Sequence, residues 1–188
     1  TDPFGNQRLI PRGILREPLS SLKRADMFIL SKTNLNPDIA DIKDFLARIN
    51  PQAAIFESMH QPAGFYDISK PETLININAL QGKGVALFCG IADPDSFENL
   101  ILSLGIKVGL SFRFHDHHNY TKEDLDKIVA GSKDKNIDTI ITTEKDAARL
   151  CDLRVLATCD LQVLVLRIKL EIKNEERLHH RLLRLYSD

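Results

Sequence analysis

Short runs of apolar residues alternate along this chain with stretches in which apolar residues recur every three or four positions. The short runs predict strands at residues 27–31, 53–58, 73–77, 85–89, 107–112, 138–142 and 161–168. The periodic stretches predict helices that begin after the capping residues Asn36 (followed by Pro37), Asp93, Thr121, Thr143 and Asn174. This alternation predicts an α/β fold, a mostly parallel sheet with flanking helices.

The region between the second and third predicted strands is rich in turn-forming residues. Pro62, Gly64 and Pro71 fall there, and such residues interrupt regular structure. We therefore expect an extended linker at residues 53–80, between a first unit at 1–52 and a second α/β lobe at 81–172. A C-terminal helix is predicted at 173–188.

Composition narrows the class of protein. The chain has 188 residues, of which 43% are apolar and 27% charged, and a formal net charge of −1. This balance is typical of a soluble globular protein and provides no general attraction to nucleic acid or anionic lipid. Its apolar runs are far shorter than the roughly 20 residues that span a bilayer. Three cysteines without metal-binding spacing indicate free, mostly buried thiols in a cytosolic setting.

Polar clusters follow three of the predicted strands, at residues 90–95, 115–118 and 142–146. In a parallel sheet the carboxyl ends of the strands share one edge, where ligands collect. We therefore expect the three clusters to lie at one edge. The first and third clusters are also explained by helix capping, because Asp93 precedes Pro94, and Thr143 and Asp146 have the spacing of a capping box.

The cluster after residue 114 holds four consecutive titratable side chains, His115, Asp116, His117 and His118. Histidine titrates near neutrality, so one of these rings, oriented by a carboxylate, could act as a general base. A solvated loop of histidines explains the pattern equally well. A metal site needs more ligands than the scattered carboxylates elsewhere supply. His179 and His180 on the last helix are interpreted as surface residues.

The first sixteen residues contain three arginines, Arg8, Arg12 and Arg16, among glycines and prolines. Guanidinium groups bind phosphate oxygens in a bidentate manner, and a loop rich in glycine and proline can hold them in place. Three arginines on a solvated surface are the alternative interpretation.

Residues 5–19 (GNQRLIPRGILREPL) strongly resemble the GN-x-R-LLP-x-G-x-LREPL run of the tetraacyldisaccharide 4′-kinase family. Residues 114–117 resemble the F-x-DH motif of that family, and residues 143–146 resemble its TEKD motif. Residues 88–94 are similar to its strand-exit run. The likeness extends from Asp2 to about Leu150, and its motifs occur in the family's order.

The resemblance implies a P-loop kinase that transfers a phosphoryl group from ATP to the 4′ hydroxyl of the lipid A disaccharide precursor. It implies peripheral attachment to the cytosolic face of the bacterial inner membrane and no nucleic-acid partner. In this family ATP and Mg²⁺ are held by a P-loop, yet no G-x-x-x-x-G-K-[ST] string occurs here. Because the chain opens on Thr1 in a loop-like run, we expect it to be the back part of a larger enzyme. Residues 1–52 would then end the nucleotide-binding domain.

The resemblance also assigns roles to individual residues. His117 and Asp116 match the DH pair and are the candidate catalytic residues. The candidate substrate-binding residues match the first motif: Arg16, Glu17, Asn6 and Arg8. No residue of this chain is expected to bind the cofactor or a metal ion, and Lys145 and Asp146 are interpreted as structural.

Two other hypotheses remain at this stage. Residues 116–118 also spell the DHH signature of metal-dependent phosphoesterases, for which Asp93 and Asp95 would be further ligands. The chain could instead be a soluble binding lobe without catalysis of its own. For the isolated chain we expect this last outcome in an assay.

Overall fold

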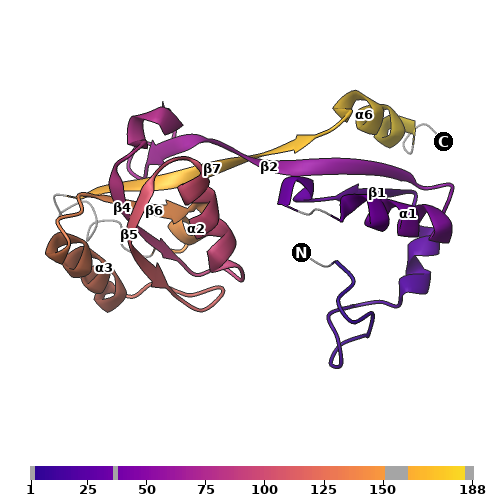
Figure 1. The fold of residues 1–188 in the computed structure, drawn as a ribbon, viewed down its shortest axis with the longest axis horizontal. Coiled ribbons are helices and arrows are strands. Elements are labelled where there is room, and N and C mark those ends of the chain that lie inside the picture. The colour runs from indigo at the N-terminus through magenta and orange to yellow at the C-terminus, as the bar shows by residue number, and fades with distance from the viewer. Residues whose placement is uncertain (1–2, 36–37, 151–160, 185–188) are drawn as a thin grey trace. The chain divides into compact units, whose positions relative to one another are not determined.

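The computed structural model describes residues 3–35, 38–150 and 161–184 (Figure 1). The chain forms two compact units. Unit 1 comprises Thr1–Gln61 and Lys169–Asp188, and unit 2 comprises Pro62–Ile168. Two strands, β2 (Ala54–Asp67) and β7 (Gln162–Ile172), contribute residues to both units.

Unit 1 contains short strands and helices from both ends of the chain. These are the 3-10 helices η1 (Leu19–Arg24) and η2 (Thr33–Leu35), the strand β1 (Met27–Leu30) and the α-helices α1 (Ile39–Ile49) and α6 (Glu175–Arg184). β1 pairs in parallel with the first part of β2. The strand and the helix predicted here are confirmed. The predicted cap of α1, Asn36 with Pro37, lies outside the described residues.

Two polar side chains join the elements of unit 1. Asn50, which follows α1, donates from Nδ2 to the carbonyl oxygens at the end of η1, those of Leu22, Lys23 and Ala25, at 2.9–3.2 Å. Glu57 of β2 accepts hydrogen bonds from Lys173 at 2.7 Å and Lys43 at 2.6 Å. These bonds hold the pKa of Glu57 below its usual range, so its carboxylate stays ionised between its two partners.

Unit 2 is an α/β sandwich. Its remaining elements are β3 (Leu74–Ile75), η3 (Ile77–Leu80), β4 (Gly84–Cys89), α2 (Pro94–Ser103), β5 (Lys107–Arg113), α3 (Lys122–Asp134), β6 (Thr139–Thr143) and α4 (Glu144–Ala147). Within this unit the strand order is β2-β7-β6-β4-β5, with β3 antiparallel on β2. Strands β4 to β7 pair in parallel. The predicted fold class is confirmed.

Both faces of this sheet are buried, because α2 and α3 cover opposite sides (Figure 1). Successive side chains of a strand point to opposite faces. Leu87 of β4 accordingly packs in one core cluster with Phe97 and Ile101 of α2. Its neighbour Phe88 packs in the other cluster, which includes residues of α3. A central strand buried on both faces explains the continuous apolar run at residues 85–89.

The predicted helix caps of unit 2 are present. Asp93 accepts from the backbone NH of Ser96 at 3.1 Å, and Thr143 accepts from that of Asp146 at 3.2 Å. Thr121 and Asp124 form a full capping box at the start of α3. Local polar spacing therefore determines where these three helices begin.

The interruption of regular structure predicted around Pro62 and Gly64 is wrong. Strand β2 continues through Pro62 and Gly64 to Asp67, whereas the strand predicted at 73–77 is reduced to two residues. A Cβ atom at Gly64 would lie 2.9 Å from the carbonyl oxygen of Ile75. This glycine therefore permits the close approach of β3 rather than a turn. The predicted segments 1–52, 53–80, 81–172 and 173–188 of a larger enzyme stay a prediction.

Of the three cysteines, Cys89 lies among the described residues and is buried with a free thiol. Burial, followed by the charge of Asp146, raises the pKa of this thiol to about 11, so the group behaves as a small apolar side chain. Cys151 and Cys159 lie outside the described residues. Among the helices that the structure describes, none has the length and apolar character to cross a membrane.

Candidate functional site

Three loops meet at the carboxyl edge of the sheet in unit 2, where β4 lies between β5 and β6. The backbone NH of Gly90, after β4, donates to Asp146 Oδ1 at 3.0 Å. The backbone NH of His117, after β5, donates to the carbonyl oxygen of Gly90 at 3.1 Å. The expectation that the three polar clusters share one edge is therefore confirmed.

Asp146 connects these loops from the interior. Its side chain is fully buried, and its two oxygens accept from three donors: the NH of Gly90, the hydroxyl of Tyr120 at 3.0 Å and the hydroxyl of Thr143 at 2.6 Å. Burial, followed by the charge of Asp146, raises the pKa of Tyr120, so the phenol keeps the proton that it donates. The next residue back, Lys145, is exposed.

Gly90 occupies a position with no space for a side chain. A Cβ atom there would lie 2.9 Å from the carbonyl oxygen of His115, 3.0 Å from Cβ of His118 and 3.2 Å from Oη of Tyr120. The loop after β5 thus packs directly on the backbone at the exit of β4. Only glycine permits this contact without displacement of the loop.

His117 has a strained backbone and an exposed ring. Its φ angle is 63°, a value that is uncommon outside glycine and often marks a functional residue. The imidazole is 77% exposed, and its Nε2 lies 3.7 Å from Asp116 Oδ2. Its Nδ1 lies 2.9 Å from Nη2 of Arg149. The two candidate catalytic residues are therefore adjacent, with the ring directed to solvent.

His118 points to different partners. Its Nε2 lies 2.9 Å from Asp124 Oδ2, and its ring stacks on Phe114 at a centroid distance of 4.7 Å. The hydrogen bond from His118, followed by that from the Thr121 backbone, lowers the pKa of Asp124 to about 2. His118 thus belongs to the start of α3, whereas His115 is exposed.

The side chains of the histidine cluster are not arranged to bind one metal ion. Asp116, His117 and His118 do not converge on one point, since each of the two rings has its own partner. Within residues 3–35, 38–150 and 161–184, no group of three or more His, Cys, Asp or Glu side chains is arranged to hold a metal ion. The described geometry gives no support to the ligand set of the phosphoesterase hypothesis.

Sequence reasoning missed Arg149. This residue is partly buried and donates from Nη1 to the carbonyl oxygen of Gly90 at 3.3 Å, besides its contact with His117. Its Nη1 also lies 3.8 Å from Asp146 Oδ1. The available signal was its position three residues after Asp146, which places the two side chains on one side of a helical turn.

The opening loop of unit 1 has a defined backbone. Leu9 and Leu15 form an isolated bridge, and Asn6 donates from Nδ2 to the carbonyl oxygen of Arg12 at 2.8 Å and accepts from the NH of Arg8 at 3.1 Å. A Cβ atom at Gly13 would lie 2.2 Å from the carbonyl oxygen of Arg8. The side chain of Asn6, a candidate substrate ligand, therefore holds the loop in shape.

The arginines of this loop project from it. Arg8, Arg12 and Arg16 are exposed, and among the described residues none of their guanidinium groups forms an ion pair. Glu17, by contrast, pairs with Arg24. Arg8 and Arg16 thus present positive charge to solvent, whereas Asn6 and Glu17 make contacts within the loop region. All four belong to unit 1, and His117 and Asp116 belong to unit 2.

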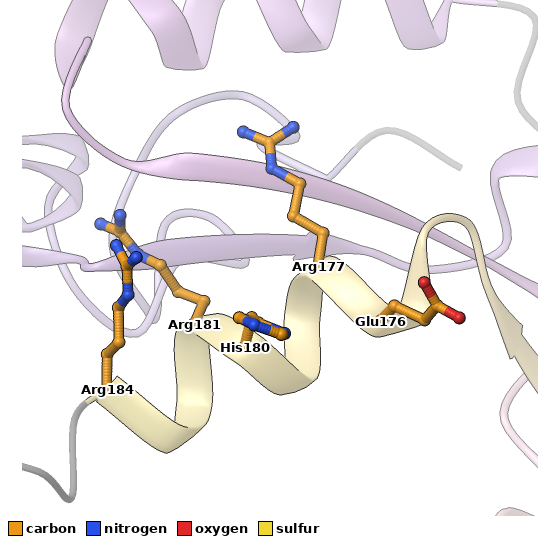
Figure 2. Close-up of a pocket in the computed structure, with 5 residues that line it drawn as sticks. All are labelled: Glu176, Arg177, His180, Arg181 and Arg184. Atoms are coloured by element: carbon orange, nitrogen blue, oxygen red, sulfur yellow. The ribbon is translucent and has the colours of Figure 1, made fainter.

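A second group of arginines lies on α6. Figure 2 shows Arg177, Arg181 and Arg184 extending to the same side of this helix. Within the part of the chain that the structure describes, none of the three has an acidic partner. Arg181 donates to the carbonyl oxygen of Asp26 at 3.4 Å. The prediction that His179 and His180 are surface residues is confirmed, because both are exposed.

This protein belongs to the α/β class: it has a mostly parallel sheet with flanking helices and a polar cluster at the carboxyl edge of that sheet. Its fold matches that of a solved structure, "apo" form LpxK from Aquifex aeolicus in complex with ATP, with a TM-score of 0.65 and 23% identity. The match covers 97% of this chain and 49% of that one. The sequence matches the family described as "LpxK: Tetraacyldisaccharide-1-P 4'-kinase" over residues 1–187. The chain therefore belongs to this family.

Curated relatives of this chain carry the same family name. The tetraacyldisaccharide 4'-kinase of Halothermothrix orenii is 36% identical over 183 residues, which are 91% of this chain and 48% of the relative. That of Anaeromyxobacter dehalogenans is 35% identical over 173 residues, which are 92% of this chain and 45% of the relative. The chain spans about half the length of the curated relatives that it matches. The family resemblance is confirmed, and the phosphoesterase hypothesis receives no support.

Proposed function

We propose that this chain is part of an ATP-dependent kinase that phosphorylates the 4′ hydroxyl of tetraacyldisaccharide 1-phosphate in lipid A biosynthesis. The family match over residues 1–187 carries this proposal. The relatives that share a third of its residues bear the name tetraacyldisaccharide 4'-kinase. ATP as phosphoryl donor is supported by the Aquifex aeolicus protein of similar fold, whose crystal structure is a complex with ATP.

The residues of this chain are better suited to contact the substrate that accepts the phosphoryl group (the acceptor side) than to bind the nucleotide. No P-loop string occurs in the sequence, and the described residues contain no metal-ligand group. A polypeptide that supplies the remaining half of the relatives' length would hold ATP and Mg²⁺, and Mg²⁺ would neutralise phosphate charge there. What this chain supplies is positioning and local charge, on which phosphoryl transfer mainly depends.

His117 and Asp116 are the proposed catalytic pair. His117 is exposed, lies at the carboxyl edge of the sheet and has a strained backbone, features that accompany ligand-contacting residues. Its ring would form a hydrogen bond at the acceptor hydroxyl or at a carboxylate beside it, with Asp116 as a neighbouring acceptor.

Arg16 and Arg8 are the proposed contacts to the phosphate of the substrate. Both guanidinium groups are exposed and lack an ion pair among the described residues, and such groups bind phosphate oxygens strongly. Asn6 would support them through the shape of the loop. Glu17 would stabilise the segment beside Arg16 through its ion pair with Arg24.

We also propose peripheral contact with the cytosolic face of the inner membrane. The arginines of α6, of which Arg177 and Arg184 are exposed, support this step, since arginine clusters on an amphipathic helix attract anionic lipid. Leu183, which is 65% exposed on the same helix, adds apolar surface.

The role of His117 can be tested in a longer chain that carries the upstream half of the family's sequence. We expect His117→Ala to lower kcat about 100-fold or more, the range typical of a lost acid–base group. His115→Ala is the matched control, because His115 is exposed in the same loop and is not assigned a role. Equal kcat values for His117→Ala and the parent would remove His117 from the site.

A further inference from the structure

Arg149 makes a bridge between the interior of the site and the exposed histidine. Its Nη1 binds the carbonyl oxygen of Gly90 and lies near the buried carboxylate of Asp146, while Nη2 reaches His117 Nδ1. The arginine side chain is only 22% exposed. Buried groups therefore fix the guanidinium of Arg149. The ring of His117 is exposed and would rotate freely without this contact.

The chemistry of the two groups determines the direction of their hydrogen bond. A guanidinium group carries donors and no acceptor, and it stays protonated in proteins. At 2.9 Å, His117 Nδ1 must therefore accept the hydrogen bond. A neutral ring whose Nδ1 accepts carries its proton on Nε2.

The surroundings of the ring indicate what the outward nitrogen can do. Charged groups that face His117 are the Asp116 carboxylate, 3.7 Å from Nε2, and the Arg149 guanidinium at Nδ1. Asp146 lies behind Arg149 and balances its charge. The N–H of Nε2 is thus available as a donor to a carboxylate or a hydroxyl at the outer side of the loop.

We propose that Arg149 is a positioning residue, which holds the imidazole of His117 in one orientation and one tautomer with the proton on Nε2. This inference rests on the proposed function, because it names the group that prepares His117 for the kinase reaction. It acts through His117 and does not itself touch the reacting atoms. Second partners of this kind commonly decide which nitrogen of a histidine carries the proton.

The tautomer can be read directly from nitrogen-15 NMR of the histidine rings in this chain at about pH 8, above the reference pKa of imidazole of about 6.5. We expect His117 Nδ1 to show the shift of an unprotonated nitrogen and Nε2 that of a protonated one. In Arg149→Met, both tautomers become populated and the two shifts move toward each other. Arg113→Met is the matched control, since Arg113 pairs with Asp95 and Glu98 instead.

A proton on Nδ1 in the parent chain would overturn the proposal, and so would identical His117 shifts in the parent and Arg149→Met. If Arg149→Met does not fold, the parent spectrum and Arg149→Lys still decide, because lysine keeps a donor and should retain most of the separation between the two shifts. These readouts do not depend on catalysis.

Kinetics of the longer chain supply the functional readout. We expect Arg149→Met to lower kcat about 10- to 100-fold with little change in KM for ATP, as expected for a misplaced catalytic group. Arg149→Lys should recover part of the loss. An active parent with an unchanged Arg149→Met variant defeats this inference alone, whereas an inactive parent defeats the proposed function and leaves the NMR result to stand.

Discussion

Asp146 shows how one buried residue supports the candidate site. Its carboxylate accepts hydrogen bonds from the exit of β4, from Tyr120 and from Thr143. Each of these donors would lose a partner without it, and an unpaired buried polar group costs about 1–3 kcal/mol. The loop that carries His117 therefore depends on a residue that does not itself contact the exposed ring.

Gly90 offers a direct test of this packing. We expect Gly90→Ala to lower the free energy of unfolding by about 1–3 kcal/mol, because the new methyl group overpacks the contact with His115 and His118. Gly84→Ala is the matched control, since no atom lies within 4 Å of a Cβ atom there. Urea denaturation of both variants measures the difference, and equal losses would show that the close contact is not formed.

Part of this residue-scale arrangement could be predicted from sequence. The spacing of Thr143 and Asp146 indicated a cap, and the cap is present. The hydrogen bond that the NH of Gly90 donates to Asp146 spans 56 residues, so no local pattern could indicate it. Arg149 escaped notice for the same reason, because its partner His117 lies 32 residues away in sequence.

Helix α3 begins with a full capping box, formed by Thr121 and Asp124. Asp124 accepts from the backbone NH and the hydroxyl of Thr121 and contacts His118. The side chain of His118 thereby connects the loop after β5 to the following helix, whereas His117 contacts Arg149 instead.

The low pKa of Asp124 predicts a pH dependence. Its folded-state pKa of about 2 lies below the ordinary value of 3.8, so its stabilisation is present above about pH 4 and is lost as the pH falls toward 2. We expect Asp124→Asn to lower the free energy of unfolding by about 1 kcal/mol at neutral pH. That deficit should shrink in urea titrations at successively lower pH. A deficit that stays constant down to the acid limit would contradict the assignment.

The basic face of α6 predicts lipid selectivity. We expect this chain to bind vesicles that contain phosphatidylglycerol and not vesicles of phosphatidylcholine alone. Replacement of Arg177, Arg181 and Arg184 by Gln should weaken binding about 100-fold or somewhat more, since each basic residue contributes about 1 kcal/mol. Replacement of Lys122, Lys127 and Lys133 on α3 removes the same charge and serves as control in a sedimentation assay. Equal effects of the two triple variants would indicate general charge rather than α6.

At the scale of elements, the strands and helices predicted from strong periodicity are present in the structure. The error at Pro62 and Gly64 has a physical source, because both residue types are typical of turns and also of strand positions with special contacts. Gly64 is buried against the backbone of β3, a contact between segments that the chain pattern cannot display.

At the scale of the whole molecule, the candidate residues divide between two units. The exposed arginines of the opening loop belong to unit 1, and the histidine site with its supporting Asp146 and Arg149 belongs to unit 2. Unit 2 builds its site from its own residues. The sequence resemblance named the candidate residues, whereas their packing required the structure.

The central claim is that this chain supplies the acceptor side of a lipid kinase and not its nucleotide-binding loop. Transfer of radioactive γ-phosphate from ATP to tetraacyldisaccharide 1-phosphate, measured for this chain and for a longer chain with the upstream half, tests it most directly. We predict product at the 4′ position from the longer chain and none from this chain alone. Phosphorylation by this chain alone, or none by a folded, ATP-binding longer chain, would contradict the account.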